Sequence, residues 1–169
     1  MREEVFDIYD ENNNPIGIQK LRSVVHAKLK DWHRATHIWI VNDKGQILCQ
    51  QRSMKKDANP GKWQSFFGGH LKAGQTYESN ASAELNEELG LDIKVEDLVP
   101  IRNSKDEDVK HFGQVYLVKW NGDIGDLHFN DGEVEQVKWM YGDEIKAGER
   151  RGVYASNLDE EILKKIRPT

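Results

Sequence analysis

The stretch GHLKAGQ at residues 69–75, continued by AELNEELGL at residues 83–91, decides the fold and points to the chemistry of this chain. A glycine-rich turn there leads into a predicted helix that carries Glu84, Glu87 and Glu88. Because these residues are three and four positions apart, they share one helix face, where like charges repel by roughly a few tenths of a kcal/mol per pair. Mg²⁺ and Mn²⁺ prefer carboxylate oxygen, so a bound ion would reverse that cost. The stretch therefore predicts a metal-loading helix, and the metal suggests phosphate chemistry.

The ends of this helix can also be predicted. Thr76 is a suitable N-cap, and Gly90 is a natural C-terminal stop. Glu84 and Glu88 flank the apolar stripe, so we expect them to line the edge of a cleft rather than open water. The stripe itself is formed by Tyr77, Ala81, Leu85 and Leu89.

Composition limits the class of protein. The chain has 169 residues, of which 37% are hydrophobic and 31% charged, as in an ordinary soluble globular protein, and we expect a single domain over residues 1–169. A net charge of −5 argues against affinity for a nucleic acid polymer, although a small anion could still be held by a metal and a few local cations. The only cysteine, Cys49, cannot form an internal disulfide. No membrane-spanning run or signal peptide is visible, so we expect a cytoplasmic protein with no membrane partner.

Several short strands surround the predicted helix. Alternating or apolar runs separated by turn residues predict strands at 5–9, 37–41, 46–51, 63–67, 93–101, 113–120 and 134–140. Residues 21–30 fit either a short helix or an extended segment, and residues 157–160 open a predicted C-terminal helix. This mixture favours an α+β fold, an α/β/α sandwich with a mixed sheet.

Residues 69–91 resemble the Nudix box, the signature of the Nudix hydrolase superfamily. The chain departs from the box twice, with Gln75 in place of its first Glu and Ala83 in place of its Arg. The segments 9–17, 32–42 and 60–63 are similar to the branch close to isopentenyl-diphosphate isomerase, and 133–139 resembles the usual late Nudix strand. The resemblance implies a mixed β-sheet between helices. The matching box positions are Gly69, Glu84, Leu85, Glu87, Glu88, Gly90 and Leu91.

The resemblance also implies an activity and a set of ligands. Relatives hydrolyse a diphosphate linkage in a small molecule, typically a nucleoside diphosphate derivative, with Mg²⁺ or possible Mn²⁺ as cofactor. The expected metal ligands are Glu84, Glu87, Glu88 and the carbonyl of Gly69. Glu84 and Glu87 are also candidates for catalysis. Glu133, in a late acidic loop, is a candidate general base, and its alternative is a solvated turn residue.

Other residues are candidates for binding the substrate. Arg52 and Lys56 precede a Pro-Gly turn and could hold a phosphate. The backbone at Gly68 and Gly69 can approach a ligand closely. Trp63 could stack on a base or an isoprenoid, with core packing as the alternative. His70 follows in the same loop and could line the substrate site.

The two departures from the box leave a second reading open. Ala83 cannot support the neighbouring Glu84, and Gln75 cannot act as a base. Because a lost supporting partner costs about 10–100-fold in metal affinity or activity, the alternative is a weakened domain that binds a diphosphate without turnover. Isomerase activity is disfavoured, because Gly68 stands where that enzyme has its active-site cysteine and Gln114 where it has its late glutamate.

Three histidines add a further question. His26, His33 and His70 align with the three metal-binding histidines of the isomerase. They could hold a second metal, or His26 and His33 could make structural hydrogen bonds while His70 lines the substrate loop. The partner expected from all these features is a small-molecule diphosphate, and the chain is expected to be a monomer or a homodimer.

Overall fold

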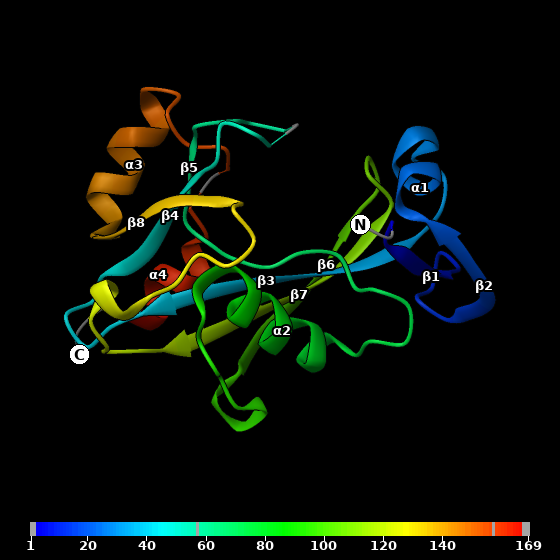
Figure 1. The fold of residues 1–169 in the computed structure, drawn as a ribbon, viewed down its shortest axis with the longest axis horizontal. Helices are drawn as coiled ribbons and strands as arrows, with labels where there is room; N and C mark the ends of the chain where they lie inside the picture. The colour runs from blue at the N-terminus through cyan, green and yellow to red at the C-terminus, as the bar shows by residue number, and fades with distance from the viewer. Residues whose placement is uncertain (1–2, 57, 157, 167–169) are drawn as a thin grey trace.

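The computed structural model describes residues 3–56, 58–156 and 158–166 (Figure 1). Its centre is a mixed sheet with the strand order β5-β4-β3-β7-β6, in which β8 also pairs with β4. Strands β3 (His33–Val41) and β7 (His111–Lys119) run parallel, and the other pairs are antiparallel. The remaining strands of this sheet are β4 (Ile47–Arg52), β5 (Trp63–Gln64), β6 (Val99–Asp106) and β8 (Val134–Met140).

Helices cover both faces of this sheet. Helix α2 (Tyr77–Leu89) packs through Ala81, Leu85 and Leu89 on strand residues that include Ile38 and Ile40. Because side chains alternate along a strand, Trp39 and Val41 of β3 point to the opposite face. That face is covered by α3 (Gly142–Arg150) and α4 (Glu160–Ile166). The α+β fold, a mixed sheet between helices, is confirmed.

The N-terminal part forms a separate lobe at the right of Figure 1. Strands β1 (Val5–Tyr9) and β2 (Pro15–Leu21) form a two-stranded sheet, and α1 (Arg22–Lys28) follows directly. Phe6, Ile8 and Val25 form a small core of their own. The Ala73 N–H donates to the Val5 carbonyl at 2.7 Å, which ties this lobe to the loop before α2. The ambiguous residues 21–30 are thus mostly helical.

Helix α2 begins and ends where the sequence predicts. The Thr76 side chain accepts a hydrogen bond from the Ser79 N–H at 3.1 Å, and the Ser79 hydroxyl accepts one from the Thr76 N–H at 2.9 Å. Gly90 closes the helix in the left-handed region at φ 69°. These caps fix the rotation and length of the helix that carries the three glutamates.

Three expectations need correction. Residues 93–98 are not a strand: a 3₁₀ turn, η1 (Val95–Asp97), comes first, because the Leu98 N–H bonds locally to the Val95 carbonyl at 3.1 Å. Beyond β5, the predicted strand 63–67 continues only as an isolated bridge between Phe67 and Ile38. The C-terminal helix begins at Glu160, and Asn157 lies outside the described residues. Among the residues described, no helix has the length and apolar character needed to cross a membrane.

Candidate active site

The three glutamates of α2 lie in different surroundings. Glu88 is buried, with 5% of its surface exposed, and its Oε2 accepts a hydrogen bond from the Gly68 N–H at 3.2 Å. Glu84 is partly buried and accepts from the Asn80 side-chain amide at 3.3 Å. Glu87 is exposed and faces the Lys72 ammonium at 3.3 Å. The helix face therefore runs from a buried carboxylate to a solvated one.

Burial changes the acidity of the two inner carboxyl groups. Removal from water, together with the nearby Glu87 charge, raises the pKa of Glu84 to about 7. Burial, followed by the Glu84 charge, raises the pKa of Glu88 well above its ordinary value. A divalent cation beside them would allow both groups to ionise, because opposite charge offsets the loss of hydration.

Gly68 and Gly69 allow the loop before α2 to pass between β3 and these carboxylates. Gly68 has φ +115°, and a Cβ there would lie 2.4 Å from the Thr36 carbonyl oxygen. A Cβ on Gly69 would lie 2.9 Å from Glu84 Oε2, so a side chain would fill the space next to the carboxylate. The Gly69 carbonyl already accepts a hydrogen bond from the Thr36 N–H at 2.9 Å, which leaves one lone pair for a metal.

A cavity of about 230 Å³ opens in front of these groups, and we call it the acidic cavity. It brings together most of the residues predicted from the sequence, from α2, the glycine loop, the end of β4 and the loop before β8. Its lining includes the predicted Glu84, Glu87, Gly68, Gly69, His70, Arg52, Lys56 and Glu133, as well as Glu4, Arg22 and Asp131.

Glu133 lies at this cavity in an ion pair with Lys56. The Ser53 N–H donates to the Glu133 carbonyl at 2.8 Å, and the Glu133 N–H donates to Asp131 Oδ1 at 2.8 Å, so the loop is held by hydrogen bonds. Burial raises the pKa of Asp131. The position is compatible with the predicted general base, although the role itself stays a prediction.

Glu88, Trp63 and Gln75 are absent from this lining, and Glu88, which was expected at the edge of a cleft, is buried behind it instead. Trp63 is in β5, where its ring contacts the Lys138 ammonium at 5.4 Å and packs on the core beneath α3 and α4. The structure thus shows that Trp63 packs on the core, which was the alternative role, and its stacking on a substrate stays a prediction. Gln75 accepts hydrogen bonds from the Lys72 N–H at 2.7 Å and from the Asn80 amide at 3.3 Å, so it closes the turn into α2.

The three aligned histidines do meet in space. One ring nitrogen from each of His26, His33 and His70 lies within 4.8 Å of the other two. His33 Nδ1 lies 3.1 Å from the Asp31 carbonyl, which assigns its proton there and leaves the buried Nε2 without a partner among the described residues. Burial lowers the pKa of His33 to about 4 and also lowers the pKa values of His26 and His70, so the rings are neutral near pH 7.

This cluster fits a transition-metal ion. Neutral imidazole nitrogens are its usual ligands, and a carbonyl that holds the far nitrogen of the ring is the usual support. Ring contacts extend the cluster to His111, whose ring centre lies 6.1 Å from that of His33. The alternative, in which these rings make structural hydrogen bonds, is supported among the described residues by the contact of His33 Nδ1 with the Asp31 carbonyl.

Comparison with known proteins fits this geometry. A family model described as "NUDIX domain" matches residues 31–158, which include both α2 and the loop with Glu133. The chain belongs to the Nudix domain family. The glutamate helix and its glycine loop both lie within the matched residues.

Relatives of two kinds are similar to this Nudix chain. Nudix hydrolase 3 of Arabidopsis thaliana is 43% identical over 94 residues, which are 55% of this chain and 12% of that protein. An isopentenyl-diphosphate Delta-isomerase of Brevibacterium linens is 27% identical over 150 residues, 85% of this chain and 80% of that one. The chain therefore spans about an eighth of the Arabidopsis protein, and the similarity to an isomerase agrees with the branch inferred from sequence.

A solved structure shows the same fold. The crystal structure of DR0079 from Deinococcus radiodurans matches with a TM-score of 0.75 over 98% of this chain and 100% of that chain, at 23% sequence identity. This likeness includes the N-terminal lobe, which precedes the family match.

Sequence reasoning missed three residues that line the acidic cavity. Asp131 could have been predicted from the sequence, because it belongs to the same acidic turn as Glu133. No sequence pattern marks Glu4 and Arg22 as residues of this site. They reach the cavity from the N-terminal lobe, where Arg22 pairs with Glu4 at 2.7 Å, and only the docking of that lobe places them there.

Proposed function

We propose that this Nudix chain hydrolyses a diphosphate linkage in a small molecule, with a divalent cation held by Glu84, Glu87, Glu88 and the Gly69 carbonyl. The observation that carries the proposal is a helix with one buried and one partly buried glutamate, Glu88 and Glu84, both with raised pKa values, beside a cavity that Arg52 and Lys56 also line. Membership of the Nudix family supports hydrolysis of this general kind.

The cation, when bound, would neutralise phosphate oxygens and acidify a water. The residues of the chain supply the rest. Arg52 and Lys56, which line the same cavity as Glu84 and Glu87, attract and orient the phosphates. Either Glu84 or Glu133, which both line the cavity, would take a proton from the attacking water. The water then attacks phosphorus, the bridging P–O bond breaks, and the leaving phosphate carries away its electron pair.

Two finer statements extend the proposal. We propose Mg²⁺ as the ion, with Mn²⁺ able to replace it, because the donor set consists of oxygens. We propose a nucleoside diphosphate derivative as the first substrate class to test. This choice follows the substrates that are typical of the family. The box itself does not select a substrate, because specificity depends on loops outside it.

A weakened domain that binds a diphosphate without turnover is the second candidate. Gln75 and Ala83 favour it, because the box positions that would carry a glutamate and an arginine supply neither charge. The hydrogen bonds of Gln75 show that it closes the turn into α2 instead.

A phosphate-release screen separates the two candidates. We would assay nucleoside diphosphates and triphosphates, dinucleoside polyphosphates, sugar nucleotides and prenyl diphosphates with Mg²⁺ or Mn²⁺. Glu87→Gln is the test variant, and Glu96→Gln, an exposed carboxylate outside the cavity, is the matched control. Release that is lost only in Glu87→Gln supports a hydrolase. Silence across the panel, with ligands that still raise the melting temperature, supports the binding protein.

A further inference from the structure

A second, larger cavity continues from the acidic cavity. It has a volume of about 710 Å³, against about 230 Å³, and we call it the basic cavity. The two cavities adjoin, because they share lining residues, and we call the two together the hollow. The residues common to both are Arg22, Arg52, Lys56, His70 and Glu133.

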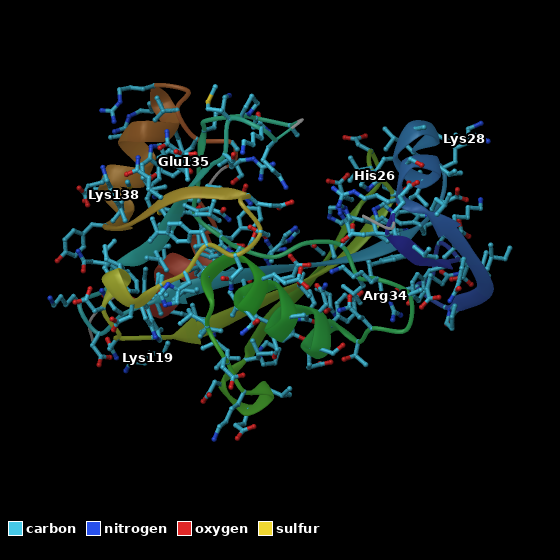
Figure 2. The ribbon with its side chains drawn as sticks, in the orientation of Figure 1. His26, Lys28, Arg34, Lys119, Glu135 and Lys138 are labelled. Atoms are coloured by element: carbon cyan, nitrogen blue, oxygen red, sulfur yellow. The ribbon has the colours of Figure 1, made fainter. Side chains whose placement is uncertain are left out.

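Two parts of the fold face each other across the basic cavity. Arg22, Ser23 and His26 come from α1 in the N-terminal lobe, and Lys55 and Ala58 come from the loop after β4. Figure 1 shows this loop and α1 on opposite sides of the sheet's centre. Figure 2 shows His26 on the side of α1 that faces the rest of the molecule, with Lys28 on the outer side.

The two ends of the hollow carry opposite charge. At the acidic cavity, the carboxylates of Glu4, Glu84, Glu87, Asp131 and Glu133 outnumber the cations. At the basic cavity, the cations Arg22, Arg52, Lys55 and Lys56 face only Glu3 and Glu133 among the described lining residues.

Two of these cations have no acidic partner among the residues that the structure describes. Arg52 donates to the Ala58 carbonyl at 3.0 Å and to Gln64 Oε1 at 2.9 Å, both of which are neutral groups. Neither Arg52 nor Lys55 has a carboxylate partner within the described part of the chain. Lys56 and Arg22, in contrast, pair with Glu133 and Glu4. Unpaired cations in a concave site favour an anionic ligand.

Within its described lining, the basic cavity has no aromatic ring other than the imidazoles of His26 and His70. No Phe, Tyr or Trp is among its described lining residues. Trp39 and Phe66 line a different cavity, on the α4 side of the sheet, and Trp63 packs in the core. Stacking on aromatic rings is the common way to hold a nucleobase. The far end of the hollow is therefore better suited to a charged group than to a base.

We propose that the substrate carries a phosphate beyond its scissile diphosphate, and that this phosphate binds in the basic cavity against Lys55, Arg52 and Arg22. The inference rests on the proposed function for the position of the scissile diphosphate at α2. The substrate class is a small diphosphate with a further phosphate at its other end. That phosphate can sit on a carbon skeleton or continue a linear phosphate chain.

Matched substrates test this inference. 5-Phosphoribosyl 1-diphosphate carries the further phosphate on carbon, and inorganic tripolyphosphate carries it in line. Isopentenyl diphosphate and ADP-ribose have only the diphosphate. We expect kcat/KM to be at least about tenfold higher for one of the first two, and whichever is preferred identifies the source of the phosphate. Equal rates for compounds with and without the further phosphate would overturn the inference.

Substitutions of the cationic residues test which of them binds the further phosphate. Lys55 is exposed, and its side chain makes no hydrogen bond or ion pair with the described residues, so Lys55→Gln leaves the packing intact. We expect it to raise KM about tenfold for compounds with the further phosphate and less than twofold for the others, as loss of one charged contact does. Arg22→Gln is the second variant, and Lys94→Gln, exposed and outside both cavities, is the control. Equal effects of Lys55→Gln on both substrate classes would show that Lys55 acts on the scissile diphosphate, which contradicts the inference.

A binding measurement separates failure of this inference from failure of the proposed function. Isothermal titration with tripolyphosphate in EDTA reports on the basic cavity without metal or turnover. If no compound is hydrolysed but tripolyphosphate binds about tenfold more weakly to Lys55→Gln, the anion site stands and the hydrolase does not. If diphosphates are hydrolysed but tripolyphosphate binds both proteins equally, the hydrolase stands and the anion site is wrong.

Discussion

Neutralising Glu84 should stabilise the metal-free protein. The carboxyl group is held in a partly buried place beside Glu87 and Glu88, and burial raises its pKa from 4.5 to about 7. A raised pKa means that the folded state binds the proton more tightly than the unfolded chain does, so ionisation at higher pH opposes folding. Glu84→Gln removes the charge and keeps the shape of the side chain, including an oxygen that can accept from Asn80.

The size of the effect follows from the two pKa values. Each tenfold change in proton affinity corresponds to about 1.4 kcal/mol, so a rise from 4.5 to about 7 gives at most about 3.5 kcal/mol, which the partial exposure of Glu84 reduces. The cost is absent below pH 4.5, where both states hold the proton. It grows between pH 4.5 and 7 and is constant above pH 7. Metal-free Glu84→Gln is therefore expected to be more stable than wild type by about 2 to 3 kcal/mol at pH 8.

Urea unfolding in EDTA at pH 8 and pH 4.5 measures this difference. Glu96→Gln is the control for removing an exposed carboxylate and should give no gain, whereas Glu87→Gln should give a smaller gain than Glu84→Gln, because the Glu87 charge contributes to the raised pKa of Glu84. Mg²⁺ should stabilise wild type at pH 8 and have a smaller effect on Glu84→Gln, since the variant lacks one ligand. A variant that is no more stable than wild type at pH 8, or equally stabilised at both pH values, would refute this reasoning.

Three further predictions follow from single contacts. Gly69→Ala should lower metal affinity about tenfold in a titration while the melting temperature stays close to wild type, because its Cβ would press only on the end of the Glu84 side chain. Ala83→Arg with Gln75→Glu should raise turnover about 10-fold or more in the phosphate-release assay, and no gain with unchanged metal binding would count against a weakened hydrolase. Burial lowers the pKa of His37 to about 4, so folding stability should fall as pH drops from 6.5 towards 4, and His37→Gln should reduce that loss by up to about 1.4 kcal/mol per pH unit in urea unfolding.

Local signals explain what the sequence predicted well. Helix α2 has a polar N-cap at Thr76, a stop at Gly90 and an apolar stripe between them, and each acts within a few residues. Strand β8 was predicted at its observed bounds, Val134–Met140, for a similar reason. Because the glutamates are placed by this one helix, their shared face could be predicted without knowledge of the rest of the fold.

Other features depend on contacts between distant segments. Strand β2 has almost no buried side chain, so its sequence lacks the alternation that marks a strand, and pairing with β1 alone places it. The Lys56–Glu133 ion pair joins the loop after β4 to the loop before β8. Helix α3 buries only Ile145 and Gly148, which is too few for a clear helical period.

The N-terminal lobe determines the part of the site that the family signature does not specify. The family match begins at residue 31, yet Glu4, Arg22 and His26 line the hollow in front of the glutamate helix. The box supplies the carboxylates, whose chemistry suits any diphosphate. In the proposed substrate complex, Arg22 and His26 on the N-terminal lobe would contact the part of the substrate that extends beyond the diphosphate. Since only differences between substrates can produce specificity, substitutions in residues 3–26 should change which compound is preferred, and substitutions in α2 should change turnover of all of them.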